Sequence, residues 1–251
     1  MKPRIPSVKI IGTGRYLPDE ITTNYDLESI VDTSEEWILE RTGIRERRIA
    51  SADVTVASMG AAAARIALEK AGVDPSKIDI LIVSTATPDR LLPSTACDIQ
   101  ALLDLSNAVA FDVSAACSGF LYALTMAEGH ISTGRGRIAL VVATEKMSSI
   151  TDWSDRSTCV LFGDGAGAVV LQGSDGERGI LGTRHGSDGN LAELLYRPAG
   201  GAAIPFDEEV LRNRSHLLQM SGQEVFKNAV RSMAESASSA LEQSGLTPDD
   251  V

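Results

Sequence analysis

Short apolar runs alternate with alanine-rich segments along most of the chain, and this alternation limits the fold more than any other feature. The runs ILIVS and RIALVVAT are almost continuously apolar, which is typical of strands that are covered on both faces. Strands are predicted at residues 7–11, 80–84, 108–113, 137–144 and 168–171, and helices at residues 55–71, 95–103, 117–132 and 223–244. This order predicts a layered α/β fold with a buried sheet.

A weak internal repeat suggests how the layers are organised. Residues 68–78 read LEKAGVDPSKI and residues 241–251 read LEQSGLTPDDV, so that Leu, Glu, Gly and Pro recur at matching positions. In each copy the glycine marks the end of a predicted helix. In the first copy a core strand follows, whereas the sequence ends with the second copy. If the match is not due to chance, the chain is cut just before a core strand.

Charge and cysteine usage exclude several classes of protein. A formal net charge of −11 argues against a general binder of nucleic acid or of anionic membranes, because both require a basic face. No apolar run approaches the ~20 residues that span a bilayer, and the start MKPRIPSVKI lacks the apolar core of a signal peptide. The three cysteines, at positions 97, 117 and 159, form no CxxC pair, which predicts neither a disulfide framework nor a zinc site. We therefore expect a cytoplasmic protein.

Cys117 lies in the segment FDVSAACSGF, among residues too small to crowd a thiol. The predicted strand at 108–113 ends just before it, and a predicted helix begins at it. A helix N-terminus favours a thiolate through its dipole and its free N–H groups, and a nearby N–H could face an oxyanion that forms on a thioester. These residues indicate a nucleophile. A buried, unreactive cysteine is the alternative.

A second candidate site follows the segment Thr33-Ser34-Glu35-Glu36, which fits a capping box at the start of a helix that Gly43 ends. Trp37 and Arg41 then share one face of this helix. An indole beside a guanidinium suits a nucleotide, since the first can stack on a base and the second can bind a phosphate. An exposed aromatic ring beside a solvated charge is the alternative.

Two glycine-rich segments do not fit phosphate loops. IIGTGRYL, at residues 10–17, has Leu17 where a dinucleotide fingerprint has its third glycine, and no suitable helix follows. GDGAG, at residues 163–167, is not followed by Lys-Ser/Thr and precedes a strand. We expect close backbone packing at the second segment.

The segment DVSAACSGF resembles the active-site segment of the β-ketoacyl-acyl-carrier-protein synthase III family, which belongs to the thiolase-like superfamily. Four further blocks agree with that family in the same order: NYDLESIVDTSEEWILERTGIRERRIA, FGDGAGAVVL, HGSDG and MSGQEVFKNAV. The resemblance implies a five-layer αβαβα arrangement of two duplicated halves. Residues 1–180 would form the first half, and residues 181–251 the incomplete start of the second.

The resemblance also implies an activity and its residues. Cys117 would accept an acyl group from acyl-coenzyme A and pass it to malonyl-acyl-carrier protein by decarboxylative condensation, with no cofactor or metal, in a homodimer. The positions matching the coenzyme A site are Thr33, Trp37, Arg41, Arg156, Gly222 and Phe226, and those matching the acyl pocket are Leu92, Met147 and Phe162. The family's partner His and Asn would follow Val251, outside this sequence.

Some alternatives stay open at this point. Arg41, Arg45, Arg47 and Arg48 could attract an acidic carrier protein or the phosphates of the coenzyme, although the last two could equally belong to a solvated loop. His130, His185 and His216 are expected to be structural or solvent-exposed. The rival functions are transfer of the acyl group to a hydroxyl or amine, and acyl-coenzyme A binding without catalysis. The sequence does not decide the acyl chain length.

Overall fold

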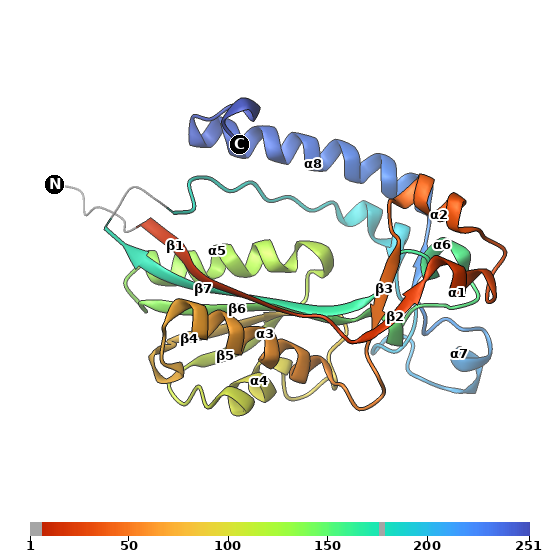
Figure 1. Ribbon diagram of the computed structural model, residues 1–251, viewed down its shortest axis with the longest axis horizontal. Coiled ribbons are helices and arrows are strands. Elements are labelled where there is room, and N and C mark those ends of the chain that lie inside the picture. Colours follow the sequence, from red (N-terminus) through yellow and green to blue (C-terminus); the bar gives the residue numbers. More distant parts are fainter. Residues whose placement is uncertain (1–6, 176–178) are drawn as a thin grey trace. The chain divides into compact units, whose positions relative to one another are not determined.

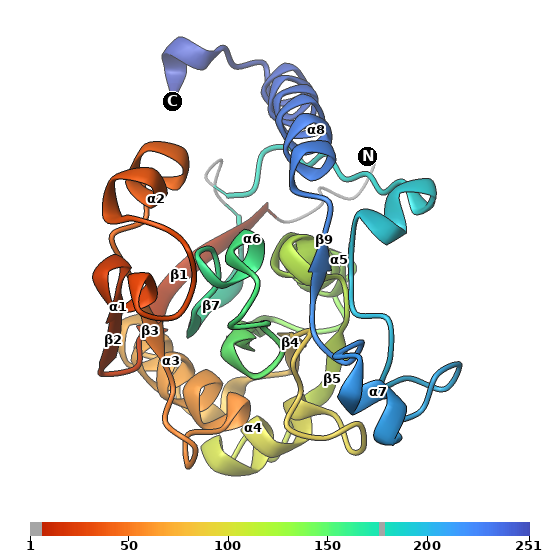
Figure 2. The same ribbon diagram turned by 90° about the vertical axis from the view of Figure 1, so that its right-hand side faces the viewer.

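The computed structural model describes residues 7–175 and 179–251 (Figures 1 and 2), and the chain divides into two compact units. Unit 1 comprises Met1–Glu20, Arg48–Lys146 and Asp164–Leu181, and unit 2 comprises Ile21–Arg47, Met147–Gly163 and Gly182–Val251. The chain leaves unit 1 for the last time after Leu181, next to the boundary predicted from the sequence. The organisation into two duplicated halves stays a prediction.

Unit 1 is built on a five-stranded mixed sheet. Its order is β1 (Ser7–Tyr16), β7 (Asp164–Ser174), β6 (Ile138–Lys146), β4 (Ile80–Ser84) and β5 (Val109–Val113). β4 is parallel to β5 and β6, whereas β7 is antiparallel to β1 and β6. All five predicted strands are confirmed. β1 and β7 are longer than predicted, because their glycines and polar residues interrupt the apolar pattern without interrupting the hydrogen-bonded pairing.

Helices cover both faces of this sheet. α3 (Val56–Ala71) and α4 (Thr95–Leu103) pack on one face and α5 (Gly119–Ser132) on the other (Figures 1 and 2). The side chains of β4 alternate between the two layers, with Leu81 and Val83 in the cluster under α3 and α4, and Ile80 and Ile82 in the cluster under α5. Each fully buried side chain of this size contributes about 1.5–3 kcal/mol to stability, so the apolar runs read from the sequence form the core.

The glycines of the IIGTGRYL segment allow close packing of the backbone. This agrees with the prediction that the segment is not a dinucleotide fingerprint. The segment continues as strand β1 up to Tyr16. A Cβ atom at Gly12 would lie 2.3 Å from the carbonyl oxygen of Ala67, and one at Gly14 would lie 2.0 Å from that of Ala63. The two glycines therefore let β1 approach the backbone of α3 more closely than any side chain allows.

Two carboxylates tie the helices of unit 1 to its loops and strands. Asp89 accepts hydrogen bonds from the N–H groups of Val56 and Ala57 at the start of α3, at 2.8 and 2.9 Å. Asp112, on β5, accepts from the first two N–H groups of α4 at 2.7 and 2.8 Å. A carboxylate at a helix N-terminus satisfies unpaired donors and complements the helix dipole. The aspartate of the DVSAACSGF segment therefore anchors a neighbouring helix.

Unit 2 consists mainly of short elements joined by long connections. Its helices and strands are α1 (Asn24–Glu28), α2 (Glu35–Thr42), α6 (Arg156–Cys159), β8 (Leu195–Tyr196), α7 (Glu208–Arg212), β9 (Gln219–Met220) and the long α8 (Gly222–Ser244). Two further strands, β2 (Glu20–Thr23) and β3 (Glu46–Ile49), form a two-stranded sheet where the chain passes from one unit to the other. No residue of α8 is buried. Among the described residues, no helix is both long and apolar enough to cross a membrane.

The two copies of the internal repeat adopt the same local structure. α3 and α8 both end at a left-handed glycine, Gly72 with φ 62° and Gly245 with φ 67°. In each copy the next residue also donates to the helix, Val73 to Leu68 at 3.1 Å and Leu246 to Leu241 at 2.9 Å. A 3₁₀ turn then begins at the matching proline. A left-handed glycine cap of this kind ends many helices, so the duplication stays a prediction.

Candidate active site

Cys117 lies on a tight turn between a strand and a helix of unit 1. β5 ends at Val113, a 3₁₀ turn spans Ala116–Ser118, and α5 begins at Gly119. The helix therefore starts two residues later than predicted, and Cys117 belongs to the turn that precedes it. Ala116 has a φ of 45°, in the left-handed region where a residue with a Cβ atom pays roughly 1–2 kcal/mol. Strained backbone of this kind is concentrated at functional sites.

The segment Ser84–Thr87 contacts both ends of this turn. The N–H of Thr85 donates to the carbonyl of Val113, the last residue of β5, at 3.3 Å. A Cβ atom at Gly119 would lie 2.1 Å from the hydroxyl oxygen of Ser84, so only glycine allows α5 to start this close to the end of β4. The backbone around Cys117 is thus fixed on its strand side and on its helix side.

The three cysteines differ in exposure. Cys117 is exposed, Cys97 is half-buried and Cys159 is buried, and all three are free thiols. The sulfur of Cys97 lies 3.3 Å from the hydroxyl of Ser94. Burial raises the pKa of the Cys159 thiol, and the charge of Asp155 raises it further. The description of a buried, unreactive cysteine therefore fits Cys159, whereas Cys117 is accessible to a substrate.

In unit 2, Trp37 lies between two arginines. The guanidinium carbon of Arg41 is 5.0 Å from the centre of the indole ring, and that of Arg156 is 4.9 Å from it. Arg156 also donates to the carbonyl of Asp32 at 2.7 Å. Both distances are within the ~6 Å at which a cation is attracted to the face of an aromatic ring. The structure thus brings together three of the residues predicted to bind a nucleotide.

The helix that carries Trp37 is confirmed, but its predicted capping box is wrong. α2 begins one residue later than a Thr33 cap would require, and the hydroxyl of Ser34 accepts from the N–H of Trp37 at 3.1 Å. Gly43 ends the helix in the left-handed conformation, as predicted. The hydroxyl oxygen of Thr33 is buried and has no hydrogen-bond partner among the described residues.

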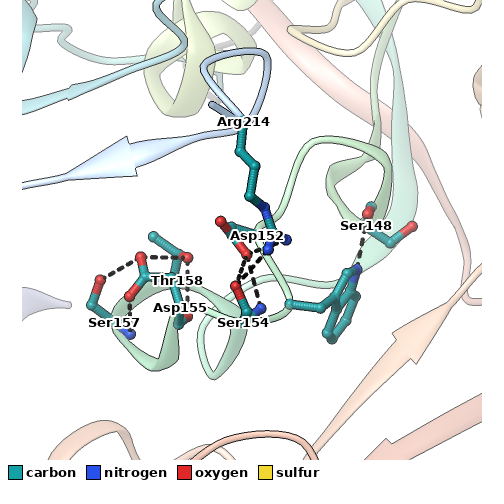
Figure 3. A network of polar contacts seen from close by, with 8 residues as sticks. Ser148, Asp152, Ser154, Asp155, Ser157, Thr158 and Arg214 are labelled. Atoms are coloured by element: carbon teal, nitrogen blue, oxygen red, sulfur yellow. Dashed lines mark hydrogen bonds and ion pairs between the residues drawn. The ribbon is translucent and has the colours of Figure 1, made fainter. Parts of the chain in front are cut away.

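A polar network, shown in Figure 3, orders the segment that carries Arg156. Arg214 forms an ion pair of 2.6 Å with Asp152 and donates to the hydroxyl of Ser154 at 2.8 Å. Asp155 caps α6 by accepting from the N–H of Ser157 at 2.9 Å. Arg214 itself has a φ of 61°. The sequence analysis did not identify Arg214, and no local signal marks it, because its partners lie about 60 residues earlier in the chain.

The remaining predicted positions lie at the surfaces of their units. In unit 2, Gly222 opens α8, and Phe226 on the same helix is 71% exposed. Met147 follows β6 directly, and Phe162 precedes β7; both side chains are half-buried. In unit 1, Leu92 is 85% exposed. The pairs Gly222–Phe226 and Met147–Phe162 thus belong to unit 2, and Leu92 to unit 1.

One part of the predicted basic cluster is not a surface feature. Arg47 is buried, with 4% of its surface exposed, and donates to Asn24 at 2.7 Å and to the carbonyl of Val160 at 2.6 Å. Burial lowers the pKa of Arg47, and the neighbouring Cys159 opposes this change. The prediction that Arg47 contacts a carrier protein, a phosphate or solvent is therefore wrong. Arg41 and Arg45 are exposed.

The histidines do not form part of either site as described. His130 lies on α5, and a Cβ atom at Gly136 would be 2.7 Å from its ring, so it packs at the far end of that helix from Cys117. His216 contacts the ring of Phe206, with centroids 6.2 Å apart. Among the described residues, no group of three His, Cys, Asp or Glu side chains could hold a metal ion.

Comparisons with known proteins agree with this arrangement. Residues 111–189 match the model of the 3-oxoacyl-[acyl-carrier-protein] synthase III family. The β-ketoacyl-[acyl-carrier-protein] synthase III of Caldanaerobacter subterraneus is 49% identical over 96% of this chain and 73% of its own length, and that of Clostridium acetobutylicum is 49% identical over 98% and 74%.

The fold agrees as closely as the sequence. The crystal structure of 3-oxoacyl-[acyl-carrier-protein] synthase III from Aquifex aeolicus VF5 superposes with a TM-score of 0.88 at 49% identity, over 97% of this chain and 74% of that one. This confirms a thiolase-like α/β fold. The chain belongs to the β-ketoacyl-[acyl-carrier-protein] synthase III family, the condensing enzymes that initiate fatty-acid synthesis.

Proposed function

We propose that Cys117 is the nucleophile with which this condensing enzyme captures an acyl group from acyl-coenzyme A. The observation that carries the proposal is an exposed, free thiol on a strained turn, directly after β5 and directly before α5. The N-terminus of α5 favours negative charge on the nearby sulfur, or on the oxyanion that forms when the sulfur attacks a carbonyl, through the helix dipole. The N–H groups of Ser118 and Gly119 donate within the turn, to the carbonyls of Ala115 and Ala116.

The first half-reaction is a transfer between two thioesters. The Cys117 sulfur forms a bond to the acyl carbonyl carbon, and the bond between that carbon and the coenzyme A sulfur breaks. Coenzyme A leaves as a thiolate and takes up the proton that the cysteine thiol gave up. The reaction exchanges one thioester for another, which is the pattern of covalent, ping-pong catalysis.

Trp37 and its two arginines are the proposed contact for the coenzyme. Trp37 and Arg156 would hold the adenine between them, and the adjacent Arg41 would contact phosphate. Two stacking contacts of about 3.5 Å each need about 7 Å between the flanking groups, whereas Arg156 lies 4.9 Å from the ring of Trp37. Adenine binding therefore requires the half-exposed Arg156 side chain to move outward, which would also break its hydrogen bond to the Asp32 carbonyl and its ion pair of 4.0 Å with the Asp32 carboxylate. Thr33, Gly222 and Phe226 are the proposed contacts along the rest of the coenzyme.

In the second half-reaction, the proposed acceptor is malonyl-acyl-carrier protein. Loss of carbon dioxide leaves a carbanion that attacks the acyl-enzyme, so that a carbon–carbon bond forms and the bond to the Cys117 sulfur breaks. The products are 3-ketoacyl-acyl-carrier protein and free Cys117. We place Leu92, Met147 and Phe162 at the acyl pocket and the reaction in the cytoplasm, without a metal or other cofactor. The comparisons support condensation and give no support to the two rival functions.

A homodimer is the proposed assembly. In the described part of the chain, β5 pairs as a strand with β4 alone, and its first residue, Val109, is 60% exposed. Leu91 and Leu92 are 81% and 85% exposed in the same unit. A strand edge without a strand partner is a surface on which a second copy can add by strand pairing, and the exposed leucines of the same unit could be covered in such an assembly. Light scattering after gel filtration tests this, and a monomeric mass at micromolar concentration would exclude it.

The first half-reaction can be tested directly. The protein is mixed with acetyl-coenzyme A, digested, and analysed by mass spectrometry for an acetyl group on each cysteine. We expect the adduct on Cys117 and not on Cys97 or Cys159, and none in the Cys117→Ala variant. An adduct that survives in Cys117→Ala, or an unmodified Cys117 in folded wild-type protein, would show that another residue accepts the acyl group.

A further inference from the structure

Glu145, near the end of β6, makes a cluster of hydrogen bonds that the proposed chemistry does not use. One carboxylate oxygen accepts from the N–H of Ala86 at 2.8 Å. The other accepts from the hydroxyl of Thr87 at 2.5 Å and from that of Thr85 at 3.3 Å. The N–H of Lys146 in turn donates to Thr87 at 2.9 Å. A side chain of β6 thereby holds the whole segment that follows β4.

This segment is the one that supports the turn of Cys117. β4 lies between β5 and β6, and Ser84 is level with Val113 on one side and with Ala143 on the other. The N–H of Thr85 donates a hydrogen bond to the last residue of β5. The hydroxyl of Ser84 lies against Gly119 and limits how closely α5 can approach. A continuous chain of contacts therefore runs from the Glu145 carboxylate to both ends of the turn.

A carboxylate at this position is destabilised by its burial. Burial raises the pKa of Glu145, although its hydrogen bonds to the two threonines and to Ala86 oppose that change. The nearest basic side chain in sequence, Lys146, directs its ammonium group to the carbonyls of Ser51 and Val54, and the nearby Asp89 caps α3. A carboxylate accepts at both oxygens, whereas an amide has one acceptor oxygen and would turn its N–H donors either toward the N–H of Ala86 or toward the two threonine hydroxyls. The observed hydrogen bonds use an acceptor at both positions.

We propose that Glu145 is a positioning residue for Cys117. By fixing the segment Ser84–Thr87, it holds the turn in the geometry that presents the sulfur and the N-terminus of α5 to an acyl carbonyl. This inference rests on the proposed role of Cys117, and it adds a residue that acts through the segment after β4 and touches neither substrate nor sulfur. A displacement of about 1 Å at a nucleophile can slow a reaction that depends on alignment about a hundredfold.

The chain offers a matched control for this proposal. Asp79 joins the same two strands at their opposite ends, where its carboxylate accepts from the N–H groups of Arg137 and Ile138 at 2.6 and 2.9 Å. Glu145→Gln and Asp79→Asn each replace one bridging carboxylate with the matching amide. Glu145→Gln should lower the melting temperature, since it places a donor where one of the existing donors needs an acceptor. Asp79→Asn removes the charge but can keep an oxygen for both N–H groups, because they donate to the same carboxylate oxygen. Only the first acts at the end of the sheet that carries Cys117.

The experiment measures the rate of Cys117 acetylation against acetyl-coenzyme A concentration for wild type and both variants. We expect Glu145→Gln to lower the maximal rate about tenfold and to leave the half-saturating concentration unchanged. Glu145→Asp should recover part of the lost rate. Asp79→Asn should keep the wild-type rate. Equal maximal rates in Glu145→Gln and Asp79→Asn would overturn the proposal.

A second probe separates failure of this inference from failure of the proposed function. If wild-type Cys117 takes up no acetyl group, alkylation by iodoacetamide is compared instead, with Cys97 in the same protein as the reference. A change of more than about threefold that occurs at Cys117 in Glu145→Gln and not in Asp79→Asn supports a positioning role. Unchanged alkylation in both variants rejects it.

Discussion

The two units differ in what holds them together. Both large clusters of buried apolar side chains lie in unit 1, whereas the cluster in unit 2 is formed by four buried residues, Leu27, Ile38, Cys159 and Val160. Polar contacts also hold unit 2 together, such as those of the buried Arg47 and the network around Arg214 (Figure 3). The candidate nucleophile thus lies at the end of a close-packed sheet, whereas the candidate coenzyme contacts Trp37, Arg41 and Arg156 lie on short helices beside a small core.

This difference has a functional meaning. A nucleophile has to stay aligned through both half-reactions, and close packing provides that rigidity. A coenzyme has to enter and leave in every turnover, and adenine binding requires Arg156 to move away from Trp37. Substitutions in unit 1 should therefore appear mainly as lost stability, and substitutions around Trp37 mainly as weaker binding.

The largest expected effect is on the packing of unit 1. Gly14→Ala would place a Cβ atom 2.0 Å from the carbonyl oxygen of Ala63, and backbone atoms on both sides would have to shift. We expect a loss of about 3 kcal/mol in the free energy of unfolding, measured by urea denaturation with circular dichroism. Gly167→Ala, in β7 of the same sheet, is the control, because a Cβ atom there meets nothing within 4 Å. Equal losses in both variants would contradict close packing as the cause.

The elements of unit 1 could be predicted because their signals are local. The apolar run at 80–84 and the helix at 95–103 match β4 and α4 residue for residue. Trp37 and Arg41 were predicted as a pair because they are four residues apart on one helix, and they do contact each other. The spacing of side chains within a helix or a strand is enough to reach conclusions of this kind.

Contacts between distant segments could not be predicted in this way. Arg47 reads as one of several charges in a basic run, and only the carbonyl of Val160, 113 residues later, explains its burial. Glu145 and Thr87 are 58 residues apart, and Arg214 and Ser154 are 60 residues apart. The alternation of polar and apolar residues does not encode such partners. The error at Thr33 has a different cause, because two adjacent hydroxyl residues both fit a helix cap.

A smaller effect, on binding, is expected at Trp37. Trp37→Ala removes the surface on which adenine would stack, and stacking of a base on an aromatic ring contributes about 1–3 kcal/mol. We expect the half-saturating concentration of acetyl-coenzyme A to rise about tenfold, with little change in the maximal acetylation rate. The melting temperature should also fall, because Trp37 packs against the buried cluster of unit 2. Tyr25→Ala is the control, because this aromatic residue of unit 2 is 68% exposed and lies on a different helix. A fall in maximal rate without a change in half-saturation would argue against a coenzyme contact.

The smallest expected effect is a pH dependence of stability at Glu145. Burial raises the pKa of this carboxyl above its ordinary value of 4.5, so the folded protein keeps the proton at a pH where the unfolded chain has lost it. The resulting stability is fully present below the unfolded pKa and is lost as the pH rises through the folded pKa. The difference in unfolding free energy between wild type and Glu145→Gln should therefore shift in favour of wild type as the pH falls through this window.

Urea denaturation of both proteins at a series of pH values measures this difference, and the subtraction removes the contribution of the other carboxyl groups. A difference that moves in favour of the glutamine variant on acidification would mean that the hydrogen bonds from Ala86, Thr85 and Thr87 outweigh burial and hold the carboxylate ionised. In that case unit 1, like unit 2, would contain a buried charged group that its hydrogen bonds stabilise. The two units would then differ only in the size of their apolar cores.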